Sequence, residues 1–167
     1  MEQADLKAAQ APLKERYRTE PEAARVTLRA EGRLGEAEVS CRVDTGRALV
    51  EAGLHPATGG TGLLACSGDM LLQALVACAG VTLAAVATAL GLEVSGTVHA
   101  EGDLDFRGTL GVGKDDGVPV GFTAIRLRFA LESDADDDSL ATRQRLTERY
   151  CVVYQTLASG VPVDVSF

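Results

Sequence analysis

The sequence has no tryptophan, two histidines and an aromatic content of 4%. Proteins that bind single-stranded nucleic acid usually stack its bases on aromatic side chains, so this shortage argues against that class. Basic residues are also outnumbered, because 16 Lys and Arg stand against 24 Asp and Glu, for a formal net charge of −8. Since phosphate backbones attract positively charged surfaces, we expect no nucleic-acid partner.

The chain also lacks the short motifs of several enzyme and metal-site classes. The opening "MEQADLKAAQAPLKERYRTE" holds no apolar core of a secretory signal, which predicts a cytoplasmic protein. In that compartment four cysteines are better interpreted singly than as a disulfide framework. No C-x-x-C, H-E-x-x-H or G-x-S-x-G occurs, so we expect no metal site, cofactor or serine triad. "GTLGVGK" (108–114) has P-loop letters, but Asp115 follows instead of Ser or Thr, which indicates a glycine-rich turn.

One long apolar run, "CSGDMLLQALVACAGVTLAAVATALGL" (66–92), stands out from this background. It is long enough to cross a bilayer, yet Ala and Gly dominate and its flanks carry no Lys, Arg, Trp or Tyr. We therefore interpret it as a buried helix and expect no membrane partner. Ser67 or Asp69 would cap the helix, which would run to about Leu90 and end at Gly91.

The remaining periodicities predict a single α+β domain with an antiparallel sheet. A short helix at 2–17 belongs to an N-terminal extension (1–23), and the domain spans 24–167. Three runs before the apolar helix read as an antiparallel meander. After it we expect one or two strands, an alternating strand, a second helix and a closing strand. These segments are, in chain order, 25–32, 38–44, 48–54, 92–110, 122–131, about 139–158, and 161–167.

The four cysteines differ in their predicted surroundings. Cys41 falls on the inward face of a strand, as a small core residue would. Cys66 and Cys78 would lie roughly 15–18 Å apart along a continuous helix, too far for a disulfide. Cys78 and Cys151 come together only if the fold brings them, and one could then form a sulfenic acid that the other resolves. From spacing alone, four buried free cysteines are the simpler interpretation.

Two segments resemble the motifs of the OsmC/Ohr family of thiol peroxidases. "SGDMLLQALVACAGVTL" is similar to the family's central-helix motif, a Pro-x-Glu-Leu-Leu run followed by small residues and Ala-Cys. "RYCVVYQTL" is similar to its second motif, Cys-Pro-Val followed by a helix. The "GGTG" loop, the terminal "VPVDVSF" and the element order over about residues 24–167 also fit.

The resemblance implies an OsmC-like fold, an intertwined homodimer in which antiparallel sheets wrap two central helices. It further implies that Cys78 attacks an organic hydroperoxide, that Cys151 forms a disulfide with it, and that an external dithiol restores both thiols. Asp69 stands near the family's supporting glutamate, with Gly68 as the alternative match. The alternative function is a non-catalytic OsmC-like stress protein that binds a small apolar or thiol-reactive ligand at the dimer interface.

The chain departs from the family pattern at two places. The loop "LHPATGGTGLLACSGD" lacks the arginine that lowers the pKa of the family's reactive thiol, and Val152 stands where the second motif has proline. Arg42, Arg47, Arg149 and an arginine of a partner chain are candidates to replace it. Because the central helix is uncharged, we expect the group that ionises Cys78 to come from outside that helix.

Overall fold

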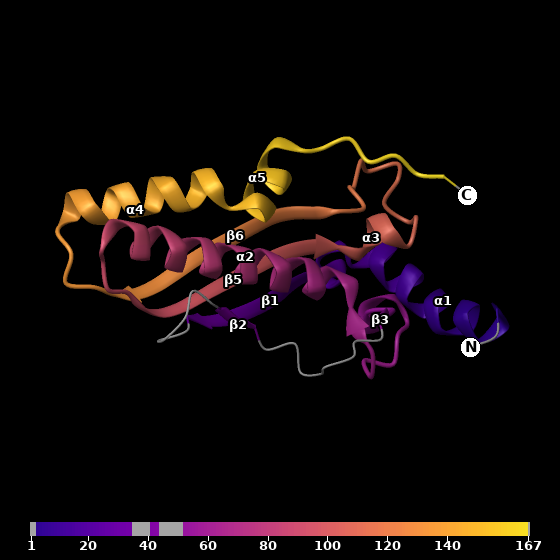
Figure 1. The fold of residues 1–167 in the computed structure, drawn as a ribbon. Coiled ribbons are helices and arrows are strands. Elements are labelled where there is room, and N and C mark those ends of the chain that lie inside the picture. Colours follow the sequence, from indigo (N-terminus) through magenta and orange to yellow (C-terminus); the bar gives the residue numbers. More distant parts are fainter. Residues whose placement is uncertain (1–2, 35–40, 44–51, 167) are drawn as a thin grey trace. The chain divides into compact units, whose positions relative to one another are not determined.

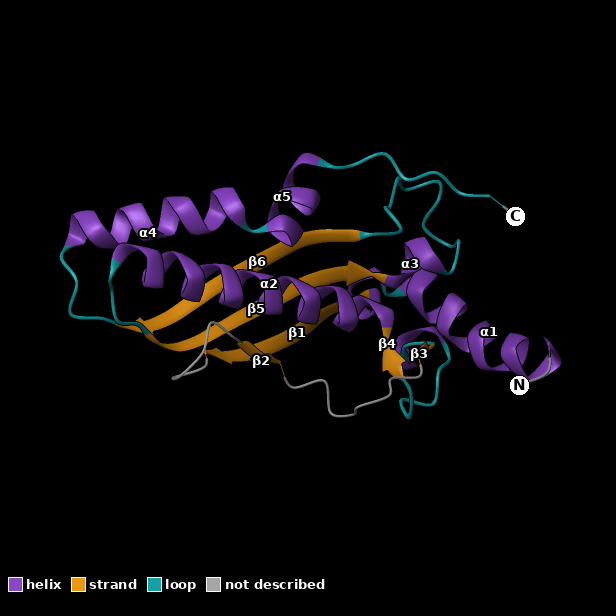
Figure 2. Cartoon of the chain, viewed as in Figure 1, coloured by secondary structure: helices purple, strands orange, loops and turns teal. Residues whose placement is uncertain are grey.

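The computed structural model describes residues 3–34, 41–43 and 52–166 (Figure 1). The helices of this part are α1 (Gln3–Thr19), α2 (Ser67–Leu90), α3 (Phe106–Thr109), α4 (Asp137–Tyr150) and α5 (Val152–Ser159), with 3₁₀ turns η1 (Pro21–Ala24) and η2 (Pro56–Thr58). The strands are β1 (Arg25–Leu34), β2 (Cys41–Val43), β3 (Ala52–Gly53), β4 (Ala65–Cys66), β5 (Ser95–Asp105) and β6 (Phe122–Glu132). Figure 2 separates the two kinds of element by colour.

The chain forms two compact units. The first holds Met1–Ala30, Thr45–Leu72 and Ala100–Arg126, and the second holds Glu31–Asp44, Gln73–His99 and Leu127–Phe167. Helix α2 and strands β1, β5 and β6 each contribute one segment to either unit.

Strands β2, β1, β5 and β6 form one sheet in that order. β1 and β2 are antiparallel, with Gly32 opposite Val43. β1 and β5 also run in opposite directions, because Thr27 Oγ1 lies 2.7 Å from Asp103 Oδ1 while Glu31 lies 3.6 Å from His99. The expected α+β class with an antiparallel sheet is therefore confirmed.

The prediction of a third meander strand over 48–54 is wrong for the residues of that range that the structure describes. Ala52–Gly53 pairs in parallel with Ala65–Cys66 in a separate two-stranded sheet, and residues 48–51 of the expected strand lie outside the described residues. The turn η2 explains the difference, because the backbone N–H groups of Thr58 and Gly60 both bond to the carbonyl of His55, at 2.8 and 3.1 Å. The chain thus folds back on itself before β4 instead of continuing the meander.

Helix α2 has the predicted bounds. Its sequence is rich in Ala and Leu, both strong helix formers, and contains no proline. Gly91 ends it in the left-handed region at φ +67°, while the N–H groups of Gly91 and Leu92 bond to the carbonyls of Thr88 and Ala87. Helix α2 is long enough and apolar enough to cross a membrane. Half of its most apolar stretch, however, is buried inside the fold.

The expected single helix over about 139–158 is wrong, because the chain leaves the helical conformation at Cys151. That residue has φ −73° and ψ 103°, so α4 ends at Tyr150 and α5 begins at Val152. Figure 1 shows α5 leaving the line of α4. The Cys151 N–H still closes α4 on the Thr147 carbonyl at 3.0 Å, and the Cys151 carbonyl accepts the first bond of α5 from Gln155 at 2.9 Å.

The prediction of a closing strand is also wrong for the described residues 161–166. Residues 161–166 have no strand partner among the described residues, and the side chains of Val161, Val163 and Val165 are exposed. Their alternation is the pattern of a strand, but an extended segment becomes a strand only when it finds a neighbouring edge.

The N-terminal helix exists as expected, with Pro12 inside it. It packs within the first unit, where Tyr17 is 2% exposed and donates a 2.7 Å hydrogen bond to the Ala57 carbonyl. Gln10 donates a second bond to the Thr58 carbonyl at 3.2 Å. Helix α1 therefore holds the turn η2.

Candidate active site

The second unit brings Cys78 and Cys151 together; we call these two residues the thiol pair. Cys78 lies near the middle of α2 and is half-buried, whereas Cys151 lies in the break between α4 and α5 and is 1% exposed. Both are free thiols, and hydrogen bonding between their side chains shifts the pKa of each. Two residues far apart in the sequence thus form one local group.

The surroundings of Cys78 favour its thiolate. Burial raises the pKa of the Cys78 thiol, but hydrogen bonding from the backbone of Val153, the side chains of Cys151 and Thr82, and the backbone of Val152 brings it below its ordinary value. Val152 and Val153 are the first two residues of α5, whose N–H groups have no carbonyl partner within the helix. The break at Cys151 therefore supplies free donors to Cys78, and a helix N-terminus is a setting that stabilises thiolates.

Thr82 corrects the expectation that nothing within α2 can help to ionise Cys78. It stands four residues after Cys78, so both side chains lie on one face of the helix, and its hydroxyl lowers the pKa of Cys78. The signal was present in the sequence, because Thr82 is one of the few polar residues of this segment and has i, i+4 spacing.

The surroundings of Cys151 favour its neutral thiol. Burial, assisted by the neighbouring Cys78, raises the pKa of Cys151 to about 11, although hydrogen bonds from the backbone of Tyr154 and Val153 oppose the increase. The two environments thus push the pKa values of one pair in opposite directions. Opposite pKa shifts of this kind give two otherwise similar thiols different chemical roles.

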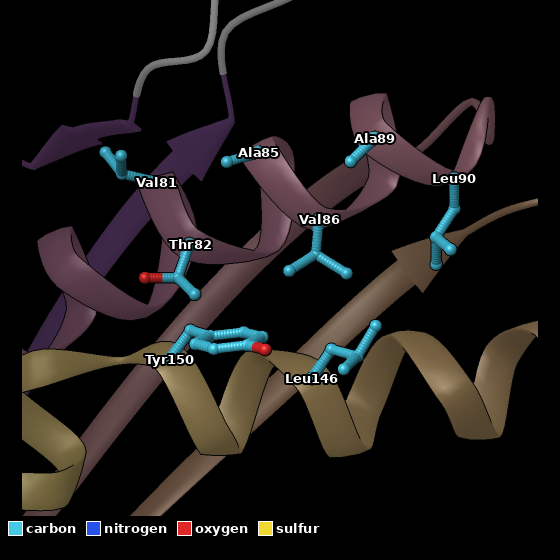
Figure 3. A pocket seen from close by; sticks show the side chains of 8 residues that line it. All are labelled: Val81, Thr82, Ala85, Val86, Ala89, Leu90, Leu146 and Tyr150. Carbon is cyan, nitrogen blue, oxygen red and sulfur yellow. The ribbon is translucent and has the colours of Figure 1, made fainter.

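An apolar groove begins beside the thiol pair. It has a volume of about 450 Å³, within the range of small-molecule sites, and Figure 3 shows α2 on one side and α4 on the other. Its lining is Val81, Thr82, Ala85, Val86, Ala89, Leu90, Leu146 and Tyr150. Thr82 belongs to both the groove and the surroundings of Cys78, so a ligand in the groove can approach that sulfur.

Asp69, the expected supporting residue, lies in the first unit. Burial raises the pKa of its carboxyl group, and the charge of His55 opposes this effect. His55 stacks on Phe106 with ring centroids 4.8 Å apart, and its Nδ1 accepts a hydrogen bond from the Ala57 N–H. The first unit thus gives Asp69 a neighbour in His55, and its support of Cys78 stays a prediction.

Of the candidates for the missing loop arginine, the structure describes the side chain of Arg149 alone, and Arg149 is not among the groups that shift the pKa of Cys78. Arg149 is exposed and lies over the Tyr150 ring, 5.5 Å from its centroid. Arg47 and the side chain of Arg42 lie outside the described residues. The groups that lower the pKa of Cys78 are instead backbone donors, a hydroxyl and a thiol.

Of the other two cysteines, the structure describes the side chain of Cys66 only. Cys66 is a free, half-buried thiol in β4, directly before the continuous helix that separates it from Cys78. Cys41 begins β2, and its side chain lies outside the described residues. In the part of the chain that the structure describes, no three His, Cys, Asp or Glu side chains are grouped as metal ligands would be.

Comparison with known families adds one result to this geometry. A family model described as "OsmC-like protein" matches residues 60–166, which include α2, both members of the thiol pair and the groove. A search of curated proteins found no match for the chain.

Proposed function

The chain belongs to the OsmC-like protein family, and from this premise we propose that it is a thiol peroxidase that reduces organic hydroperoxides. The observation that carries the proposal is the thiol pair, in which Cys78 is stabilised as a thiolate while Cys151 is held as a thiol. A peroxidatic cysteine must be ionised to attack, and a resolving cysteine must stand beside it.

The reaction proceeds in three balanced steps. The Cys78 thiolate attacks the terminal oxygen of the hydroperoxide, the O–O bond breaks, and the released alkoxide takes a proton from water and leaves as the alcohol. Cys78 is then a sulfenic acid, and Cys151 attacks its sulfur, forming the disulfide and releasing water. An external dithiol reduces the disulfide by exchange and becomes oxidised in turn.

The donors around Cys78 also serve the first step. The N–H groups of Val152 and Val153 and the hydroxyl of Thr82 hold negative charge on Cys78 before attack. As the O–O bond breaks, negative charge moves from the sulfur to the departing oxygen, and the same fixed donors lie near that developing charge.

Turnover with a defined oxidant tests the proposal. Wild type should consume cumene hydroperoxide catalytically with dithiothreitol present, and Cys78→Ser should reduce the rate to that of dithiothreitol alone. Cys66→Ser is the matched control, because it removes a free half-buried thiol outside the thiol pair. Equal rates for wild type and Cys78→Ser would refute the peroxidase.

A second candidate function is favoured by the apolar groove, which suits a small apolar or thiol-reactive ligand without catalysis. The reactivity of Cys78 as a function of pH separates the two candidates. Because its pKa lies below the ordinary value, the peroxidase requires Cys78 to be alkylated at lower pH than Cys151, whose pKa is about 11. If peptide mapping finds Cys78 alkylated only after denaturation, the binding function replaces the peroxidase.

We also propose that the active protein is the intertwined homodimer, with two copies of α2 at its centre. Four large apolar side chains of α2, Met70, Leu71, Val81 and Leu90, are exposed in the single chain although the rest of the helix is largely apolar. Large apolar side chains left exposed on a helix are typical of a contact with another chain.

A further inference from the structure

The side chain of Gln155 bridges the break between α4 and α5. Its Nε2 donates a 2.8 Å hydrogen bond to the backbone carbonyl of Glu148, in the last turn of α4. The Gln155 N–H closes the first turn of α5 on the Cys151 carbonyl at 2.9 Å. One residue therefore bonds to both sides of the break, and it does so from an exposed position outside the core.

The Glu148 carbonyl is the group to which Val152 would bond if the helix were continuous, because each N–H of an α-helix bonds to the carbonyl four residues earlier. Within the described part of the chain, Val152 and Glu148 form no such bond. The carbonyl accepts the Gln155 amide instead, and the backbone of Val152 bonds to Cys78. Two arrangements thus compete for the same groups, and Gln155 occupies the acceptor that the continuous helix requires.

No proline or glycine of this region enforces the break. Proline at position 152 would do so, because it has no N–H and requires an extended residue before it. The second motif of the family has that proline, and this chain has Val152 instead. Cys151 has φ −73°, which any residue can adopt and which does not exclude a helix. A side-chain hydrogen bond such as that of Gln155 can therefore decide between the two arrangements.

We propose that Gln155 is a positioning residue of the thiol pair, which holds the Glu148 carbonyl so that the N–H groups at the start of α5 stay free for Cys78. The inference deepens the proposed peroxidase and rests on it, because positioned donors serve a cysteine that attacks as a thiolate. Gln155 is not among the groups that shift the pKa of Cys78. It acts through the backbone of Val152 and Val153, which are among them.

The test is the pH profile of Cys78 alkylation by iodoacetamide in the reduced full-length protein, read by peptide mass spectrometry. Gln155→Met keeps the length of the side chain but removes its donor, so the Val152 N–H can return to the Glu148 carbonyl. The thiolate then loses a donor, and the midpoint should move to higher pH by up to about one unit.

Gln144→Met is the matched control for this change. Gln144 is an exposed glutamine of α4 whose Nε2 also bonds to Glu148, but to the side-chain Oε1 at 3.0 Å. Because this bond leaves the Glu148 carbonyl untouched, the profile of Gln144→Met should coincide with that of wild type.

The same substitution in a Val152→Pro background separates a positioning role from a general effect on the fold. Without an N–H at position 152 the competing bond cannot form, so Gln155→Met should now move the midpoint by less than half as much. An equal shift in both backgrounds, a wild-type profile for Gln155→Met, or an equal shift in Gln144→Met would overturn the proposal. No peroxide is used, so a failed peroxidase appears in turnover and a failed positioning role in these profiles alone.

Discussion

Thr82 stands one helical turn after Cys78 and joins two features of the molecule, the thiol pair and the apolar groove. A threonine in the middle of an apolar helix is usually explained by a bond to the carbonyl four residues earlier, as Thr88 shows with Ala84 at 2.8 Å. Thr82 instead stabilises the charge of a neighbouring sulfur. Residues of the same type on one helix therefore have different roles.

Thr82→Val should raise the pKa of Cys78, since it removes a donor that favours the thiolate. The alkylation profile of Cys78 should then move to higher pH, by at most about one unit for one neutral hydrogen bond, and the rate at pH 7 should fall severalfold. The measurement is the rate of Cys78 modification by iodoacetamide between pH 5 and 10, followed by peptide mass spectrometry.

Thr88→Val is the control for this change, because the Thr88 hydroxyl bonds to the Ala84 carbonyl of its own helix. Its profile should coincide with that of wild type. A Thr82→Val profile that also coincides with wild type would remove Thr82 from the group of residues that activate Cys78.

Among the structural elements, the break between helices α4 and α5 is the one that creates the candidate active site. One residue in an extended conformation frees the N–H groups of Val152 and Val153, and both lower the pKa of Cys78. A continuous helix would have bonded those groups to carbonyls of its preceding turn. The local fold thus supplies donors to Cys78 that the family motif did not lead us to expect.

Val152→Pro should leave the fold intact and keep or raise the midpoint temperature of unfolding. Proline suits the first residue of a helix, and it requires an extended residue before it, which Cys151 already is at ψ 103°. Val153→Pro should lower the midpoint by several degrees, because Val152 within α5 would have to leave the helical region. Circular dichroism melts of both variants measure this, and the reverse order would contradict a helix start at Val152.

The sequence predicted the uninterrupted elements better than the interruptions. The end of α2 was predicted at about Leu90, where it lies, because a long apolar run followed by Gly91 is a strong local signal. The break at Cys151 has no glycine or proline, so the 3.6-residue period continued through it unnoticed. The thiol pair itself was predicted through the family motifs, since no local pattern links residues of separate helices.

For the whole molecule we propose a homodimer, and the C-terminal segment bears on how its two chains meet. The segment 161–166 carries alternating valines that find no strand partner in the part of the chain that the structure describes, and Val163 is 77% exposed. An extended segment with one apolar face can pair with the sheet edge of another chain. We therefore expect the C-terminal segment to take part in the contact between two copies.

Val163→Lys should weaken the dimer by placing a charge on the apolar face of this segment. Val120→Lys is the control, because Val120 is also exposed and apolar but lies in the loop before β6. Size-exclusion chromatography with light scattering should give twice the chain mass of 17.4 kDa for wild type and the control, with dissociation on dilution for Val163→Lys. A wild-type mass of one chain would exclude the homodimer.

The central claim is that Cys78 is oxidised by a peroxide and Cys151 resolves the product, and intact-protein mass spectrometry tests it most directly. After one equivalent of cumene hydroperoxide without reductant, wild type should lose about two mass units, for the two hydrogens of a disulfide. Cys151→Ser should instead gain about sixteen units, for the oxygen of a sulfenic acid that dimedone traps at Cys78. Unchanged masses, or the same oxidation in Cys78→Ser as in wild type, would contradict the account.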